Sequence, residues 1–177
     1  TQPQIDDAVA VRHQLHQHPE LKFEETDTAK RVAERLTSLG YKVTEGIATT
    51  GVLAELDTGR KGPVIAFRAD MDALPIKEAN SFAHRSQREG LMHACGHDGH
   101  TTMLLGAAWA LKQQPDFKGR VVFIFQPAEE SAGGGRVMVE EGLFERFPMD
   151  AVYGLHNWPG LPVGEAAVHD TDVMAAF

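Results

Sequence analysis

The segment at residues 121–125 (VVFIF) constrains the fold of this chain more than any other feature. It contains only β-branched and aromatic residues, without a polar residue at any position. A run this short and this apolar predicts a strand that is covered on both faces, as in sheets with helices on both sides. The apolar segments 52–56, 63–67 and 151–155 are predicted strands as well.

Residues between these strands show the spacing of amphipathic or buried helices. Four helices are predicted. The first contains Ile5 to Leu15, and the second runs from Thr26 or Asp27 to Gly40. The third and fourth cover residues 101–111 and 135–142. Two further strands are expected at residues 41–45 and 163–168. Helices that alternate with apolar strands predict an α/β fold, a three-layer sandwich around a largely parallel, mixed sheet with antiparallel pairing early in the chain.

Composition excludes several classes of function. The 177 residues carry a net charge of −8 with both signs interleaved, so there is no basic stripe for nucleic acid. No apolar run reaches the roughly 18 residues that a membrane span requires. The only cysteine, Cys95, cannot form an internal disulfide, which favours a reducing, cytoplasmic location.

Polar clusters follow three of the predicted strands. Residues 68–72 (RADMD), Glu129 with Glu130, and residues 156–158 (HNW) each come at or soon after a strand end. Open α/β sheets bind ligands outside the carboxyl ends of their strands, where the loops share one crevice. We therefore expect these three clusters to form one site.

The strongest local signal is the segment 93–100 (HACGHDGH). Its glycines allow a tight backbone, so that Cys95 and His97 can face one ion. Zinc and similar cations accept thiolate, imidazole and carboxylate ligands. A buried structural cysteine with surface histidines is the alternative interpretation, which the nearby acids and His156 make less favourable.

The adjacent acids Glu129 and Glu130 fit metal-assisted hydrolysis. Neighbouring side chains in an extended segment point in opposite directions, so one carboxylate can hold metal while the other handles a proton. Such hydrolysis needs a Lewis acid and a carboxylate that passes a proton to the leaving nitrogen. A solvated loop is the alternative for this pair.

Five segments together resemble one family. Residues 15–21, 68–75, 93–100, 126–130 and 155–157 are similar, in order and spacing, to the aminoacylase and carboxypeptidase metallopeptidases. The chain looks most like their amidohydrolase branch, which includes hippurate hydrolase, N-acyl-amino-acid amidohydrolases and plant auxin-conjugate hydrolases. The resemblance runs from Leu15 to Gly164 and implies the fold of a co-catalytic metallopeptidase.

This resemblance implies two divalent metal ions, with zinc or manganese favoured and nickel or cobalt also compatible. Cys95 would bridge the ions, His97, Glu130 and His156 would complete most of the coordination shell, and Glu129 would be the general base. Asp72 would not bind metal itself but would contact the ligands and adjust the properties of the site.

Asp70 departs from the family pattern. It stands where the family has a histidine, and the resemblance implies that His97 supplies the imidazole instead. Asp70 is therefore either a ligand or half of a buried hydrogen-bonded pair with Arg68.

The family also implies a larger protein. Residues 1–170 would form the N-terminal part of the metal-binding catalytic domain, and residues 171–177 would begin a linker to a lid and dimerisation domain. That domain and the C-terminal completion of the catalytic domain, with a further histidine ligand, are absent from this sequence. The complete protein is expected to be a homo-oligomer.

The predicted function is hydrolysis of the amide bond of N-acyl amino acids, such as hippurate, or of small peptides by metal-activated water. The substrate partner is thus a small molecule, and neither nucleic acid nor a membrane is expected. The isolated chain is expected to bind metal weakly and to turn over little substrate. The alternatives are a non-catalytic metal-binding fragment and a hydrolase that uses Cys95 as a nucleophile.

Overall fold

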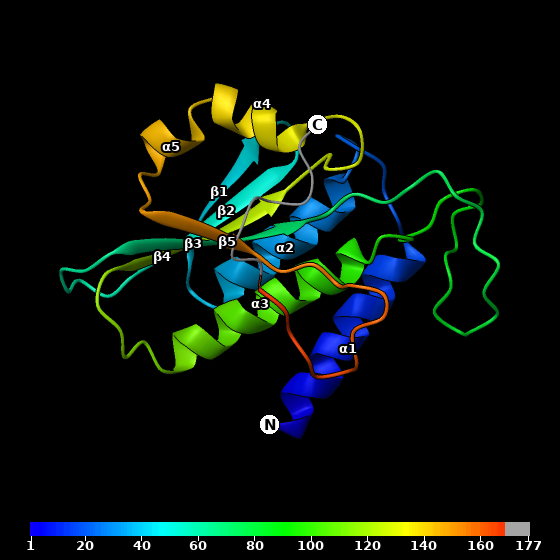
Figure 1. Cartoon of the computed structure of the whole chain (residues 1–177), viewed down its shortest axis with the longest axis horizontal. Coiled ribbons are helices and arrows are strands. Elements are labelled where there is room, and N and C mark those ends of the chain that lie inside the picture. Colours follow the sequence, from blue (N-terminus) through cyan, green and yellow to red (C-terminus); the bar gives the residue numbers. More distant parts are fainter. Residues whose placement is uncertain (169–177) are drawn as a thin grey trace.

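The computed structural model describes residues 1–168, which fold around one five-stranded sheet (Figure 1). The strand order is β1 (Lys42–Ile47), β2 (Gly51–Asp57), β4 (Arg120–Gln126), β3 (Val64–Asp70) and β5 (Ala151–Gly154). The pairs β1–β2 and β2–β4 are antiparallel, whereas β4–β3 and β3–β5 are parallel. This confirms the predicted mixed sheet, with its antiparallel part early in the chain.

The parallel half of the sheet orients the polar clusters. In β3, Asp70 is paired with Gln126 at the end of β4, and Arg68 is paired with Gly154 at the end of β5. The three strands therefore end at one edge of the molecule. The segments that follow them start side by side, as expected for a sheet of this type.

Helices cover both faces of the sheet. One face packs against α2 (Thr26–Ser38) and α3 (His97–Gln113), and the other packs against α4 (Gly134–Glu140) and α5 (Leu143–Arg146) (Figure 1). Side chains of β4 alternate between the faces: Phe123 and Phe125 face α2 and α3, whereas Val122 and Ile124 face α4 and α5. All four are at most 2% exposed, which confirms that this strand is covered on both sides.

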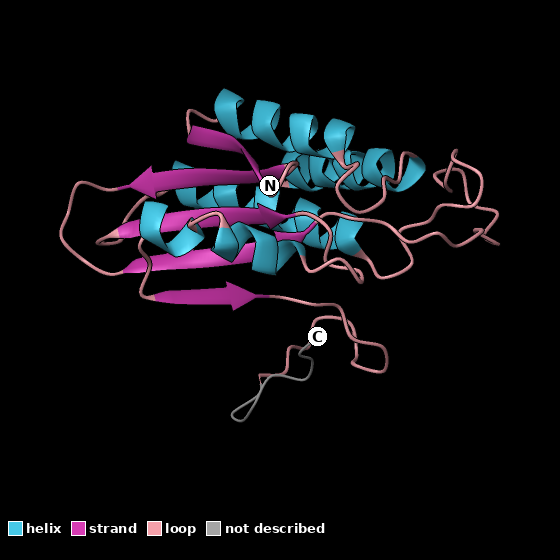
Figure 2. Ribbon diagram, turned by 90° about the horizontal axis from the view of Figure 1, so that it is seen from above, coloured by secondary structure: helices cyan, strands magenta, loops and turns pink. Residues whose placement is uncertain are grey.

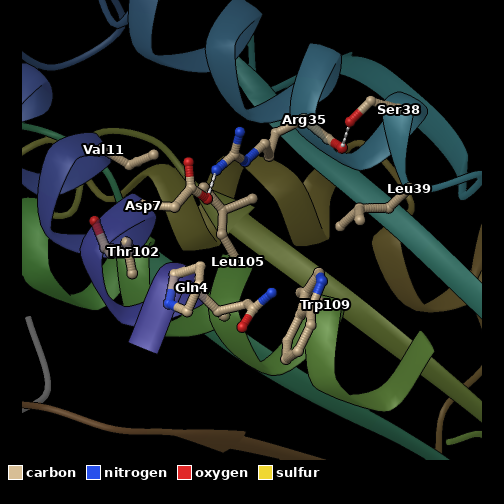
Figure 3. A pocket seen from close by; sticks show the side chains of 12 residues that line it. Gln4, Asp7, Val11, Arg35, Ser38, Leu39, Thr102, Leu105 and Trp109 are labelled. Carbon is tan, nitrogen blue, oxygen red and sulfur yellow. Dashed lines mark hydrogen bonds and ion pairs between the residues drawn. The ribbon is translucent and has the colours of Figure 1, made fainter. Parts of the chain in front are cut away.

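The first helix, α1 (Gln2–Gln17), packs on α3 outside the sheet. A pocket between α1, α2 and α3 is lined by Val11, Leu105 and Trp109, and an Arg35–Asp7 ion pair crosses it (Figure 3). None of the residues that follow the strand ends lines this pocket. The pocket is therefore separate from the polar clusters.

Two sequence predictions need correction. The helix predicted at residues 101–111 begins four residues earlier, at His97, so the histidine motif forms its first turn. The prediction of a strand at residues 163–168 is wrong, because this stretch is a turn followed by irregular chain. Gly164 adopts a positive φ of 88°, and Val163 and Val168 have no sheet to pack against and are exposed.

The sheet edge at β5 is open among the described residues. Within residues 1–168, β5 pairs only with β3 and forms one edge of the sheet (Figure 2). Val152 and Tyr153 of this strand are 43% and 58% exposed. The predicted linker at residues 171–177, like the domain boundary at 170, lies outside the described residues. No helix within residues 1–168 has both the length and the apolar character for crossing a membrane.

Phe123 should be the most sensitive position in the core. Its ring is fully buried and meets the ring of Tyr41 edge-on at 5.4 Å. Phe123→Ala should lower the free energy of unfolding by about 3–5 kcal/mol, measured by urea denaturation, because it removes contacts and leaves a cavity. Phe144→Ala is the matched control, since Phe144 is 43% exposed and its loss should cost less than about 1 kcal/mol. Equal costs for the two variants would contradict this assignment of the core.

Candidate metal centre

The ends of three parallel strands and the start of α3 supply the polar groups. Asp70 ends β3, Glu129 and Glu130 lie three and four residues after β4, and His156 lies two residues after β5. His97 is the first residue of α3, and one residue, Gly96, separates it from Cys95. Gly96 adopts a positive φ of 91°, which a glycine takes without strain.

These elements bring the four predicted ligands into one cluster. Ligand atoms of Cys95, His97 and Glu130 all lie within 4.8 Å of one another, and a second such set joins His97 to Asp70, His100 and His156. The Cys95 Sγ atom lies 3.5 Å from His156 Nε2. Side chains that span 62 positions of the sequence therefore meet at one place.

His97 is the centre of the cluster. Its side chain is fully buried, and neither ring nitrogen makes a hydrogen bond of good geometry among the described residues. Four carboxylates surround it: Asp72 lies 3.3 Å from Nδ1, Asp70 3.6 Å from Nε2, and Glu129 and Glu130 3.8 Å each from Nε2. Buried polar atoms are normally satisfied, so an imidazole of this kind fits a site built for a cation.

The negative charge of the cluster also fits a site for cations. Burial opposes ionisation of Asp72 and by itself lowers the pKa of His97. The attraction between these neighbours outweighs it, so the pKa of Asp72 is lowered and that of His97 is raised. Arg68 is the only arginine or lysine that forms an ion pair with these four carboxylates among the described residues. Divalent cations would balance the remaining charge.

Asp70 and His100 are fully engaged with other groups. Asp70 accepts hydrogen bonds from Arg68 at 2.7 Å and from His100 Nδ1 at 2.6 Å, one on each oxygen. His100 Nε2 lies against Asn157, 2.5 Å from its side-chain oxygen and 3.1 Å from its backbone nitrogen. The hydrogen bond to His100 and the charge of Arg68 outweigh burial and lower the pKa of Asp70. The Arg68–Asp70 pair is therefore a hydrogen-bonded pair, which the sequence left open.

His156 is oriented for ligation. Its Nδ1 lies 2.7 Å from the carbonyl oxygen of Asn157, so Nδ1–H donates there and Nε2 stays free toward Cys95. Metal-binding histidines commonly donate their other ring N–H to a carbonyl in this way. A Cβ at position 96 would lie 2.7 Å from the side-chain oxygen of Asn157, so a larger residue there would displace that side chain.

Glu129 and Glu130 differ from the expected arrangement. In an extended segment they would point in opposite directions, yet both carboxylates approach the same nitrogen of His97. The segment is a turn, in which Ala128 and Ser131 adopt positive φ values of 52° and 62° at a cost of about 1 kcal/mol each. Burial, together with the charges of Asp70 and Glu130, raises the pKa of Glu129. A raised pKa suits a general base.

The Cys95 thiol lies among acids. Burial, together with the nearby charges of Glu130, Asp70 and Glu129, raises its pKa to about 12. Such a thiol stays protonated at neutral pH unless a cation binds it. This surrounding suits a metal ligand better than a free nucleophile.

A second buried cluster lies next to the first, around His16 of the segment 15–21 that resembles the family. His16 of α1 lies 3.0 Å from both Asp98 of α3 and Glu78 of the long loop before it, and its side chain is 6% exposed. Arg12 pairs with Asp98 as well. This cluster ties α1 and the loop to the first turn of α3. Neither the spacing nor the composition of the sequence signals that these residues meet.

Comparison with known proteins identifies the family. Residues 66–172 match the model of peptidase family M20/M25/M40, which is more than half of the chain. The chain belongs to this family. The finding confirms the resemblance to the aminoacylase and carboxypeptidase metallopeptidases.

The relatives include amidohydrolases. The chain is 52% identical to the hippurate hydrolase of Campylobacter jejuni, over 84% of this chain and 39% of that protein. It is 45% identical to the N-acyl-L-amino acid amidohydrolase of Geobacillus stearothermophilus, over 96% of this chain and 46% of that protein. The chain thus spans less than half the length of these relatives.

Solved structures confirm the fold. The Bacillus subtilis YXEP protein, described as a dinuclear metal-binding peptidase of the M20 family, superposes with a TM-score of 0.88 and 43% identity. The match covers 93% of this chain and 46% of that one.

The His16 cluster predicts a pH-dependent stability. The hydrogen bond to Asp98 is the largest influence on His16 and, with Glu78, raises its pKa against the effect of burial. A raised pKa means that charged His16 stabilises the fold fully below its unfolded pKa of about 6.5, and that this contribution is lost as pH rises through the folded pKa. His16→Gln should therefore cost about 1.5–3 kcal/mol at pH 6 and clearly less at pH 9, measured by urea denaturation.

Gln14→Ala provides the control for this measurement. Gln14 lies on the same helix, is exposed and does not titrate, so its substitution should cost the same at both pH values. A His16→Gln cost that is larger at pH 9 than at pH 6 would contradict the assigned charge state.

Proposed function

We propose that this chain forms the metal-binding part of a metal-dependent amidohydrolase that cleaves N-acyl amino acids, such as hippurate, or small peptides. The observation that carries the proposal is the meeting of Cys95, Glu130 and His156 at His97, whose ring nitrogens make no hydrogen bond of good geometry within residues 1–168. The hippurate hydrolase and N-acyl-L-amino acid amidohydrolase relatives support the substrate class.

Cys95, His97, Glu130 and His156 are the residues that would hold two divalent cations, zinc or manganese. The dinuclear site of the Bacillus subtilis relative supports the number of ions. Cations bound there would supply Lewis-acid chemistry, polarising the amide carbonyl and lowering the pKa of water.

Glu129 is the proposed general base. Its carboxylate, 30% exposed and with a raised pKa, can accept a proton from the attacking water and deliver it to the leaving nitrogen. Asp72 positions the backbone of this base and of the adjacent Glu130. Its two oxygens accept the amide hydrogens of Glu129 and Glu130 at 2.9 Å each, and it faces His97 Nδ1.

The two alternatives account for fewer observations. A thiol whose pKa is raised to about 12 is a poor nucleophile at neutral pH, which disfavours Cys95 in that role. A purely structural metal site would have no use for Glu129, whose carboxylate remains accessible beside the proposed ligands.

The complete enzyme is proposed to extend beyond this chain. The exposed side chains of β5 and the partial coverage of the relatives support a catalytic domain in which further chain covers that edge. A lid and dimerisation domain, a homo-oligomeric state and a cytoplasmic location are retained from the sequence as parts of this proposal.

Metal binding can be tested directly on the chain. After chelation and dialysis, titration with zinc or manganese should raise the melting temperature, because only the folded state gathers the four ligands, and the weak binding should saturate at up to two ions per chain. Cys95→Ala should abolish most of this effect, since it removes the thiolate ligand.

Asp116→Asn is the matched control for the metal experiment, because Asp116 is a 95% exposed carboxylate outside the cluster. Its variant should bind metal as the parent chain does. Undiminished metal binding by Cys95→Ala would refute the proposed ligand set.

Glu129 can be tested by kinetics in the complete protein with an N-benzoyl or N-acetyl amino acid. Glu129→Gln should lower kcat by about 10²–10⁴-fold, because the amide cannot take up the proton, while the metal content stays the same. Glu140→Gln, an exposed acid on α4, should leave kcat unchanged. Activity of Glu129→Gln close to that of the parent would exclude Glu129 as the base.

A further inference from the structure

The turn that carries Glu129 and Glu130 needs support from outside itself. It leaves β4 at Gln126 and is neither helix nor strand until α4 begins at Gly134. Ala128 and Ser131 both adopt positive φ values, 52° and 62°, which side-chain-bearing residues rarely take. Contacts from other elements must therefore hold this conformation in place.

Two buried carboxylates provide that support by accepting three successive backbone N–H groups. The Ala128 amide donates to Glu25 at 2.8 Å, and the Glu129 and Glu130 amides donate to the two oxygens of Asp72 at 2.9 Å each. Glu25 is 0% exposed and Asp72 is 1% exposed. Each of these three amides thus has a fixed acceptor, and the acceptor of the first is Glu25.

Glu25 joins three parts of the fold. Its second carboxylate oxygen accepts the hydroxyl hydrogen of Thr50, in the turn between β1 and β2. Its backbone carbonyl accepts the Ala29 amide in the first turn of α2. Glu25 therefore connects the start of α2 and the β1–β2 turn to the segment that bears the acidic pair.

Filling the space at position 25 does not by itself require a carboxylate. The Glu25 carboxylate forms no ion pair with a lysine, arginine or histidine of the described residues. Burial raises its pKa, as expected for an acid far from water. An apolar side chain could fill the same space without the cost of burying a polar group. What the carboxylate adds is its pair of hydrogen bonds, to Ala128 and to Thr50.

Building on the proposed function, we propose that Glu25 is a positioning residue of the hydrolytic reaction. By fixing Ala128 in its left-handed conformation, Glu25 directs the carboxylates of Glu129 and Glu130 toward His97. Asp72 alone would hold the two following amides but would leave the entry to the turn free to relax. A shift of about 1 Å in a catalytic group can lower a rate by about 100-fold.

The test compares substitutions at Glu25 in the complete protein. Glu25→Gln keeps an oxygen that can accept from Ala128 and an amide that can donate to Thr50. Glu25→Leu removes both hydrogen bonds at similar volume, and Glu25→Asp keeps the charge but withdraws the acceptor by one methylene. Glu25→Leu and Glu25→Asp should lower kcat by about 10–100-fold with little change in KM or metal content, and Glu25→Gln should restore most of the rate.

Hydrogen exchange supplies a readout that does not depend on activity. In Glu25→Leu and Glu25→Asp, the amides of residues 128–130 should exchange about 10-fold faster or more, measured by mass spectrometry, because the turn opens more often. Glu25→Asp serves for both readouts if Glu25→Leu does not fold.

Glu20→Gln and Glu20→Leu are the matched controls. Glu20 is also a buried acid beside the start of α2, 4% exposed, but it accepts the amides of Asp27 and Thr28 and makes no hydrogen bond to the turn after β4 among the described residues. Its variants should lower stability without accelerating exchange at residues 128–130 or reducing kcat of the folded protein.

Unchanged exchange at residues 128–130 and unchanged kcat in Glu25→Asp would overturn the proposal. So would equal losses in the Glu20 and Glu25 variants, since they would reduce the effect to general destabilisation. If the unsubstituted protein neither binds metal nor hydrolyses the amide, the proposed function fails instead. The exchange experiment then still decides whether Glu25 holds the turn.

Discussion

The parallel pairing of β3 with both β4 and β5 is the constraint on which the candidate site depends. It aligns the ends of three strands, so that the segments carrying Asp72, the Glu129–Glu130 pair and His156 begin at one edge of the sheet. The covered faces of β4 provide the apolar burial that holds these strands in register. α3 then places His97 in the middle of the groups that the strands deliver.

Electrostatics ties this arrangement to its use. Four carboxylates within 3.8 Å of one imidazole repel one another, and the fold keeps them together through Arg68, His100 and backbone amides. The stability of the sheet and helices thus compensates a local cluster of like charge. A pair of divalent cations would relieve that repulsion. The apolar core, which keeps the carboxylates together without cations, would thereby contribute to the affinity of the site for them.

The sequence predicted the features that depend on local pattern. Short apolar runs located the strands, and ligand-type residues just beyond their ends indicated where the metal centre should lie. Contacts made only in three dimensions were beyond it: Glu25 with Ala128, His16 with Asp98 and Glu78, and His100 with Asp70. The strand expected at residues 163–168 does not form, because this short stretch has no neighbouring strand to pair with in the part of the chain that the structure describes. The shared direction of Glu129 and Glu130 depends on two left-handed residues that no composition rule signals.

The short edge strand has a consequence for how the centre assembles. β5 has four residues and, within residues 1–168, pairs with β3 alone, yet His156 just beyond it faces the Cys95 thiol from 61 positions away. Fraying of that strand would dismantle the ligand set while the rest of the sheet stayed folded. A cation bound by both Cys95 and His156 would link the segment after β5 to the start of α3. Its binding free energy would then stabilise the short edge strand against fraying.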